Sequence, residues 1–261
     1  MVMISKKKVL LAVIAAAAVI FTGCSFKARH YYKEGVEAYE AGNYEKAVRL
    51  LFQAKEENPD KAEYVIEYAF ALIGNNEYET AADTFLSAIL DKDIKMVKEN
   101  NKRAYRGAGI AYYMLSDYKT AVEYFDKALE YSVLPELDTD ILLYKAASYE
   151  EDKEIYKALD VYNELFEMGE DTESLHRIKA DVLRKQEDYE ESLLEYNKAL
   201  SFNKDDFGLY FGKYSVLLEL GRYDEAKEVL DRAEEIKVYD DAGLFEVGKV
   251  HFYQKIMKLQ F

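Results

Sequence analysis

The residues of this sequence that could carry out chemistry are few and scattered. The three histidines, His30, His176 and His251, lie far apart, and none has the spacing that binds a metal or activates a nucleophile. There is no Gly-rich phosphate loop and no nucleophile elbow. The Asp138-Thr139-Asp140 segment lacks the glycine and the distal glutamate of a calcium loop. The sequence therefore predicts a protein that is not an enzyme and that uses no metal or cofactor.

The other reactive residue is Cys24, the single cysteine of the chain. Three lysines at 6–8 give the chain a basic start, and an uncharged run at 9–21 follows them. That run is shorter than the roughly 20 apolar residues that span a bilayer. A basic segment, a short apolar segment and the small residues Thr22 and Gly23 are the parts of a secretory signal.

This order of residues resembles the lipobox of bacterial lipoprotein signal peptides, although Phe21 stands where that family usually has leucine or another aliphatic residue. The resemblance implies a signal peptide over 1–23, a diacylglyceryl group on Cys24 as the first mature residue, and a lipidated tether over 24–27. It also implies an extracytoplasmic protein, held by its lipid on a bacterial cell membrane or outer membrane. A plain cleaved signal and an uncleaved anchor are the alternatives.

The charge of the chain narrows the class of partner. It has 35 basic and 50 acidic residues and a formal charge of -15. Because phosphate binding rewards clustered Lys and Arg, we expect no nucleic-acid partner. Lys27, Arg29, His30 and Lys33 are the local exception to this acidity, and we expect that basic end to face anionic headgroups.

The rest of the sequence repeats. Five segments share a turn residue, a Tyr and a small residue three places later: GNYEKAVRLLFQAKEENP, NNEYETAADTFLSAIL, SDYKTAVEYFDKAL, EDYEESLLEYNKAL and GRYDEAKEVLDRAEE. A large residue follows after four more places and a small one after another three. Spacings of three and four place these residues on one face of a helix.

On a 34-residue frame the repeats run over 28–61, 62–95, 102–135, 139–172, 173–206 and 207–240, with a half repeat over 241–261. Met96–Asn101 and Glu136–Asp138 are insertions. This period resembles the tetratricopeptide repeat, which is a pair of antiparallel helices. The resemblance implies an all-α, right-handed α-solenoid of about six helix pairs plus a C-terminal capping helix.

Small residues in the frame have a mechanical meaning, because they let two helices approach closely. They are Ala47, Ala81, Ala121, Ala158, Ser192 and Ala226. We expect Tyr44 and its equivalents to fill the space between neighbouring repeats, and Gly42 and Gly221 to form tight turns. The last helix, 242–261, is more apolar than a cap requires, so it is either a slightly apolar terminal helix or a surface that a partner or another copy of the chain covers.

In the tetratricopeptide family the first helix of each repeat lines a concave groove, so its exposed positions imply a partner site. The candidates are aromatic or Arg residues, the types that dominate binding hot spots. They are Tyr32, Tyr39, Phe70, Arg103, Arg106, Tyr113, Tyr144, Arg177, Arg184 and Phe211. Packing between repeats is the alternative for about half of the aromatic residues. Arg103 and Arg106 favour a partner with acidic groups.

Anchor and repeats together predict a membrane-anchored protein-protein interaction scaffold of the bacterial cell envelope, with its partner in the groove. The alternative is an envelope assembly factor that serves outer-membrane proteins or pili, and this rests on family analogy alone. The family members that bind chaperone tails have Asn where this chain has Val36 and Glu67, so we expect no chaperone tail as the partner.

Overall fold

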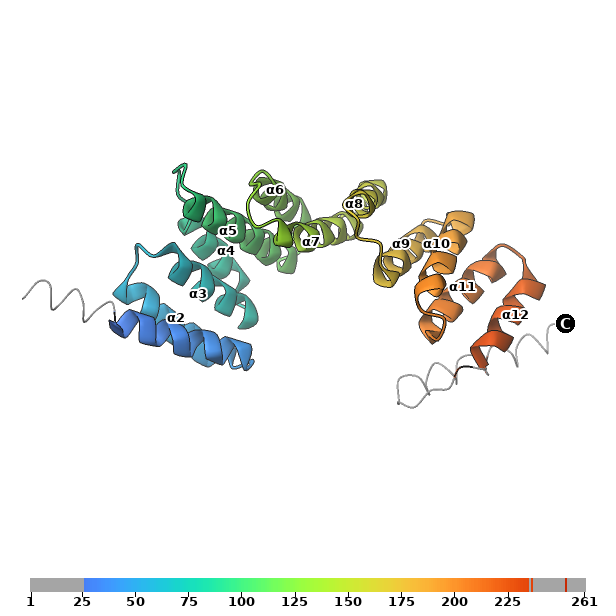
Figure 1. Cartoon of the computed structure of the whole chain (residues 1–261), viewed down its shortest axis with the longest axis horizontal. Helices are drawn as coiled ribbons and strands as arrows, with labels where there is room; N and C mark the ends of the chain where they lie inside the picture. The colour runs from blue at the N-terminus through green and yellow to red at the C-terminus, as the bar shows by residue number, and fades with distance from the viewer. Residues whose placement is uncertain (1–25, 235, 237–251, 253–261) are drawn as a thin grey trace, which may run out of the picture. The chain divides into compact units, whose positions relative to one another are not determined.

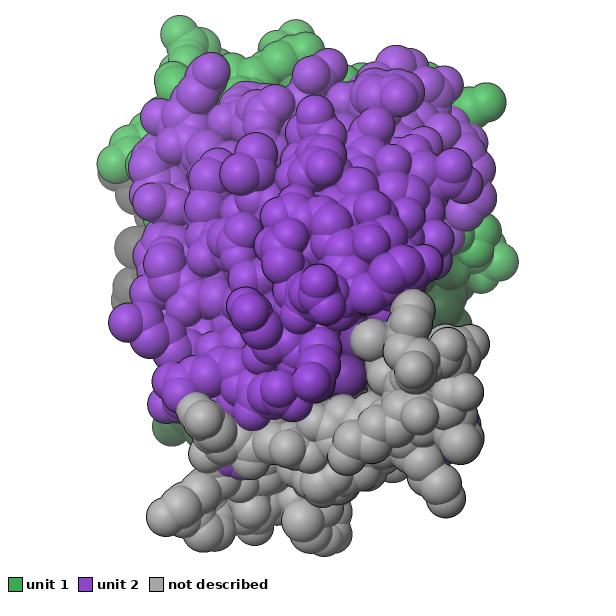
Figure 2. All heavy atoms as spheres, turned by 90° about the vertical axis from the view of Figure 1, so that its right-hand side faces the viewer, with its two compact units in different colours: residues 1–148 green, residues 149–261 purple. Residues whose placement is uncertain are grey.

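The structure is a computed structural model that describes residues 26–234, 236 and 252. It divides into two compact units, Met1–Ser148 and Tyr149–Phe261, which Figure 2 shows in different colours. All regular secondary structure in the described part is helical (Figure 1). The signal peptide, Cys24 and, apart from Phe252, the capping helix lie outside the described residues, so those predictions are carried forward as they stand.

The helices follow one another along the chain and are divided between the two units. Unit 1 holds a first helix over residues 26–40, α2 (Tyr44–Glu57), α3 (Ala62–Gly74), α4 (Tyr78–Ser87), α5 (Lys95–Met114), α6 (Tyr118–Leu129), the short 3-10 helix η1 (Pro135–Leu137) and most of α7 (Asp138–Glu151). Unit 2 holds α8 (Ile155–Glu167), α9 (Glu173–Lys185), α10 (Tyr189–Phe202), α11 (Phe207–Glu219) and α12 (Tyr223–Glu234). This all-helical repeat array confirms the predicted fold class.

Small residues bring the paired helices together, as the sequence predicts. All six of the small residues named above have no exposed surface. Ser192 replaces the usual alanine, and its hydroxyl donates a hydrogen bond to the carbonyl of Ala180 at 2.7 Å, which joins α10 to α9. A Cβ added at Gly109 would lie 2.5 Å from the ring of Phe125, so only glycine fits between α5 and α6 there.

Packing between neighbouring repeats uses the aromatic residue at the start of the second helix. The ring of Tyr44 lies against α3, where a Cβ added at Gly74 would be 2.4 Å from it. This confirms the expected place of Tyr44 between two repeats. Because each helix pair covers its apolar face with the next pair, its stability depends on its neighbours.

Each of the six turns inside a helix pair contains one residue with a left-handed backbone. Gly42 and Gly221 have φ of 72° and 69°, as their residue type predicts. The other four turns place ordinary L-residues there, with φ between 62° and 66°: Asn76, Ser116, Lys153 and Glu187. In every case the next residue donates its N–H to the carbonyl five places back, at 2.8–3.0 Å, which is the Schellman closure of a helix.

The first insertion is helical. Met96–Asn101 lies inside α5, so the extra residues lengthen its start. The second insertion, Glu136–Asp138, falls on η1 and the first residue of α7.

A fully buried lysine joins the two insertions. The ammonium of Lys102 donates to the carbonyls of Tyr131 and Val133, at 3.0 and 2.6 Å, and to the carboxylate of Asp138 at 2.5 Å. Asn101, also buried, binds the backbone N–H and carbonyl of Leu90. A buried charge is tolerated only when it is paired and hydrogen-bonded, and Lys102 meets both conditions.

We expect glycine at a left-handed turn to stabilise the array. Lys153 is exposed and has a φ of 66°, so Lys153→Gly should raise the free energy of unfolding by about 1 kcal/mol through relief of backbone strain. Gly42→Ala is the reciprocal control. A Cβ at Gly42 would meet nothing within 4 Å, so any loss there is conformational. Urea denaturation measures both, and a destabilised Lys153→Gly protein would contradict the assignment.

Candidate functional site on the first helices of unit 1

The predicted partner residues of unit 1 come from four successive first helices: the helix over 26–40, α3, α5 and α7. We call the surface that they form with their acidic neighbours the first-helix face. Its members are Tyr32, Tyr39, Glu63, Glu67, Phe70, Arg103, Arg106, Tyr113, Asp140 and Tyr144. Each is partly exposed, so their side chains reach solvent while their stems pack between helices.

The face begins with a pair of stacked tyrosines. Tyr32 lies against Tyr64 with ring centroids 4.7 Å apart, and its hydroxyl donates to a carboxylate oxygen of Glu63 at 3.0 Å. Burial and the nearby carboxylates of Glu67 and Glu63 raise the pKa of Tyr32, so its hydroxyl stays a donor throughout the physiological range.

Two arginines on α5 form ion pairs in opposite directions along the face. Arg103 donates to Glu67 on α3, and the Nε of Arg106 donates to Asp140 on α7 at 2.5 Å. The guanidinium of Arg106 also lies 5.8 Å from the ring centre of Phe70. The arginines predicted to bind acidic groups are therefore already paired with carboxylates of this chain.

These residues share one electrostatic environment. Burial is the main cause that raises the pKa of Tyr39, and the charge of Glu67 adds to it while that of Arg106 opposes it. At the other end of the face, Tyr144 contacts Tyr113 edge-on, with centroids 5.8 Å apart. The structure thus brings the predicted residues of unit 1 together on one surface.

Sequence reasoning did not predict the acidic half of this surface. Glu67 and Arg103 are 36 positions apart, and Arg106 and Asp140 are 34 apart, which is about one repeat. Opposite charges one repeat apart on neighbouring first helices are the signal that could have found these pairs. Glu67 was considered only as a residue that replaces a chaperone-binding Asn.

The other three predicted residues lie in unit 2. Arg177 contacts Asp206 at 3.4 Å and Glu173 at 3.8 Å. Arg184 pairs with Asp181 at 3.6 Å. Phe211 is half-buried and packs against the apolar core of its unit, which is the packing alternative that the sequence left open for such aromatic residues.

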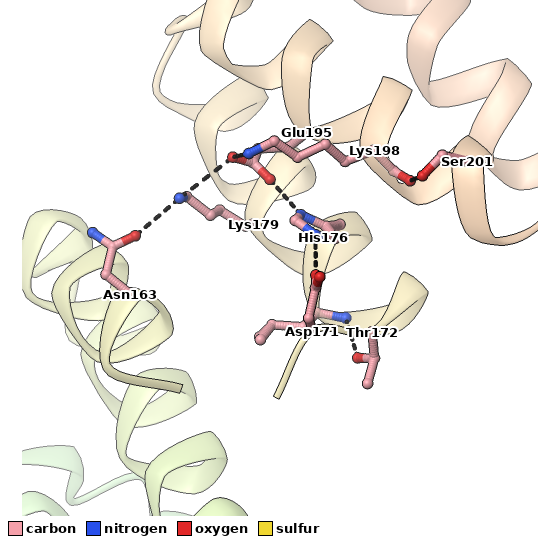
Figure 3. A network of polar contacts seen from close by, with 9 residues as sticks. Asn163, Asp171, Thr172, His176, Lys179, Glu195, Lys198 and Ser201 are labelled. Carbon is pink, nitrogen blue, oxygen red and sulfur yellow. Dashed lines mark hydrogen bonds and ion pairs between the residues drawn. The ribbon is translucent and has the colours of Figure 1, made fainter. Parts of the chain in front are cut away.

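Unit 2 also contains a buried polar cluster around His176 (Figure 3). Its Nδ1 lies 2.5 Å from Glu195 and its Nε2 lies 2.8 Å from Asp171. Both contacts are hydrogen bonds to ionised carboxylates only when both ring nitrogens carry a hydrogen. Lys179 and Lys198 surround Glu195 at 3.4 and 3.1 Å.

The contacts of this cluster stabilise the fold and do not form a catalytic arrangement. The cluster borders an open depression of about 520 Å³ with Phe166 and Phe202 at its sides. The hydroxyl of Ser201 donates to the backbone carbonyl of Lys198, so it is not aligned as a nucleophile for His176. Among the described residues no group of His, Cys, Asp and Glu side chains could hold a metal ion, and no helix is long and apolar enough to cross a bilayer.

Comparison with known proteins agrees with the repeat geometry. The tetratricopeptide repeat family model matches residues 32–97 and 71–132. These matches span residues 32–132, and together with the helix pairs of the described residues they show a repeat array similar to that of tetratricopeptide-repeat proteins. Proteins of this class are protein-protein interaction scaffolds and are typically not enzymes.

The similar proteins are of several kinds. An Hsp70-Hsp90 organizing protein of Triticum aestivum is 25% identical over 230 residues, which are 85% of this chain but 37% of that protein. One of Plasmodium falciparum is 30% identical over 76 residues, or 29% of this chain and 14% of that protein. The chain therefore spans well under half the length of both relatives.

Two solved structures show the same fold. Pseudomonas aeruginosa pilF has a TM-score of 0.63 at 16% identity, covering 88% of this chain and 99% of that one. A tetratricopeptide repeat protein of Parabacteroides merdae has a TM-score of 0.62 at 14% identity, covering 88% and 87%.

We expect Glu195 to make the stability of unit 2 depend on pH. Burial would raise the pKa of its carboxyl, but hydrogen bonds from His176 and Lys198 outweigh burial and lower it. A carboxyl group whose pKa is lower in the folded state than in the unfolded state stabilises the folded protein at pH values above its unfolded-state pKa. This stabilisation is lost as the pH falls through the folded-state pKa. Because Glu195→Gln weakens hydrogen bonds to a charged group, it should cost about 2 kcal/mol at pH 7, and progressively less as the pH falls below the ordinary pKa of 4.5.

Urea denaturation between pH 7 and pH 3 measures this difference. Glu190→Gln, on the same helix but 65% exposed, is the matched control and should change little at any pH. A constant loss for Glu195→Gln across the range would show that the carboxylate charge is not what stabilises the cluster.

Proposed function

We propose that this chain is a lipid-anchored interaction scaffold of a bacterial cell envelope, which holds an acidic segment of a partner protein on the first-helix face of unit 1. The observation that carries the proposal is the row of arginine and aromatic side chains on that face. Arginine combined with tyrosine supplies large contact area and bidentate recognition of carboxylates.

The paired arginines define how such a partner binds. A partner carboxylate must displace Glu67 from Arg103 or Asp140 from Arg106, so binding is an exchange of ion pairs. The aromatic side chains between them offer apolar contact to the same segment. A segment without acidic groups would leave the existing pairs in place and gain only that apolar contact.

A chaperone tail fits this face poorly. The name of the two curated relatives refers to Hsp70 and Hsp90, but each match covers a minor part of those proteins. At the two positions where chaperone-binding members of the repeat family have Asn, this chain has Glu67 and Val36, and Val36 packs in the apolar cluster with Leu51. Neither side chain offers the amide that the chaperone-binding pattern requires, so this face lacks that means of holding a terminal carboxylate.

The anchor is supported by the sequence around Cys24. A basic start, a short apolar run and small residues precede the single cysteine. The first helix is described from residue 26, which leaves a short tether. Two or more acyl chains are what stable membrane attachment of a folded domain requires.

The partner proposal predicts opposite effects for the two halves of the ion pairs. Arg103→Gln/Arg106→Gln should weaken capture of the partner by at least about tenfold, because its carboxylates lose their donors. Glu67→Gln/Asp140→Asn should strengthen capture, because the arginines no longer have to exchange. The measurement is a crosslinked pull-down from the native membrane, followed by titration of the captured partner.

Arg222→Gln is the control for that experiment. Arg222 pairs with Glu225 and Glu190 on the turn before α12 and is not a first-helix residue. Equal capture by all four proteins would move the partner site away from the first-helix face.

The anchor proposal predicts loss of lipid with the cysteine. Cys24→Ala should abolish incorporation of a labelled fatty acid and release the chain from sedimented membranes. Phe21→Leu supplies the aliphatic residue usual for the lipobox and should leave labelling intact or increase it. A Cys24→Ala chain that still carries the label would refute lipidation at this position.

A further inference from the structure

Unit 1 exposes large apolar side chains where the chain enters a first helix from outside or from the preceding repeat. We define the loop edge as residues 26–30, 57–61 and 90–99. Phe26 is 79% exposed, Ile94 55% and Met96 66%, and Leu90 is exposed as well. Figure 1 shows these segments along one side of unit 1, from the start of the blue helix to the loop before α5.

Side-chain contacts connect the segments of the loop edge. Lys27 forms an ion pair with Glu57 at the end of α2. Ala28 packs in one buried cluster with Ala54 and with Tyr64, in the first turn of α3. Farther along, Val65 and Ile89 belong to the next cluster. The apolar side chains are thus carried by neighbouring elements of one packed unit.

Buried polar side chains at the start of α5 hold the backbone of the loop edge near Leu90 by hydrogen bonds. The two hydrogen bonds from Asn101 fix the backbone at Leu90, and the same side chain contacts the hydroxyl of Tyr131 at 3.2 Å. The neighbouring Lys102 fixes the backbone at Tyr131 and Val133. These hydrogen bonds hold the backbone beside Ile94 and Met96, whose side chains are exposed.

The loop edge differs from the rest of the chain in charge. It carries six Lys or Arg and five Asp or Glu, in a protein with 35 against 50. Ion pairs hold part of this charge at the edge itself, such as Lys98 with Asp93 and Lys95 with Glu99. Lysines of this kind can keep the ammonium group at a headgroup while their methylene stems lie along apolar surface.

We propose that the loop edge of unit 1 docks onto the surface of the bilayer, with Phe26, Ile94 and Met96 inserted at the level of the headgroups. The inference rests on the proposed lipid anchor, because Phe26 follows Cys24 by two residues. Two residues reach at most about 7 Å, so a lipidated Cys24 brings this edge to the membrane. Apolar side chains on a near-neutral edge gain burial there, whereas an acidic surface would be repelled.

Docking in this way orients the first helices. The helix over 26–40, α3 and α5 begin at the loop edge and run away from it, so Met96 and Met114 mark the near and far ends of α5. The 18 residue steps from Met96 to Met114 correspond to about 27 Å of helix. These first helices would then point away from the bilayer surface, and a partner would reach the first-helix face in a direction parallel to the membrane plane.

Fluorescence quenching in vesicles tests the orientation. The full chain carrying Met96→Cys or Met114→Cys is labelled with an environment-sensitive thiol probe and reconstituted into phosphatidylethanolamine/phosphatidylglycerol vesicles that contain a nitroxide lipid. Both methionines are exposed, at 66% and 44%, so neither change disturbs the core. We expect roughly twofold quenching at position 96 and none at position 114.

A second pair of variants tests the apolar contact itself. Ile94→Glu in the Met96→Cys chain should remove most of the quenching. Leu194→Glu is the matched control, since Leu194 is 60% exposed on α10 in unit 2, and it should leave the quenching unchanged.

The outcomes separate this inference from the anchor proposal. If each chain carries one probe, and the probe is quenched at neither position or at both positions, the docking proposal is wrong and the anchor proposal stands. Crosslinking of position 96 to a second copy, in place of quenching, also overturns docking. Two probes per chain show that the thiol of Cys24 is free, and both proposals then fail.

Discussion

The array depends on one backbone constraint that recurs at every turn inside a helix pair. A residue in the left-handed region stops the first helix, and the N–H after it closes that helix on the carbonyl five places back. In the pairs that lie within one unit, such as α5 with α6 and α9 with α10, this closure directs the second helix back along the first, so the small residues of both come into register. The contact between Gly109 and Phe125 is tight enough to need that direction. Without the turn the apolar faces would have no fixed partner, and neighbouring pairs could not stack.

The sequence predicted the fold because its signals are local and repeated. Spacings of three and four, the small residues at fixed places and the glycines at 42 and 221 all report on one helix pair. Of the four turns without glycine, the one at Asn76 has a residue type that often adopts this backbone, but the other three were not predictable from residue type. Lys153 and Glu187, for example, adopt a backbone that ordinary residues avoid, and the surrounding helices impose it. Likewise, the sequence showed an insertion before the third repeat but not that it extends α5.

The candidate site was predictable only in part, for a physical reason. The position of a side chain on a helix face follows from the repeat, so Tyr39, Arg103 and Arg106 could be assigned to one surface. Their partners could not, because pairing depends on how α5 lies against α3 and α7. The same is true of Lys102, whose acceptors are backbone carbonyls in a loop. A search for opposite charges one repeat apart would identify Glu67 and Asp140. It would not identify the backbone carbonyls that accept hydrogen bonds from Lys102.

The array has two kinds of connection, the turn within a helix pair and the loop between successive pairs. They differ in how much change in length they tolerate. Every turn within a pair has the same length and closure, whereas the insertions of this chain lie at the start of α5 and just before and at the start of α7, where hydrogen bonds of Asn101 and Lys102 hold them. An array of this kind can therefore grow on one edge only. Its evolution, and any attempt to graft a loop or an epitope into it, has a direction: new sequence is accommodated between repeats and excluded within them.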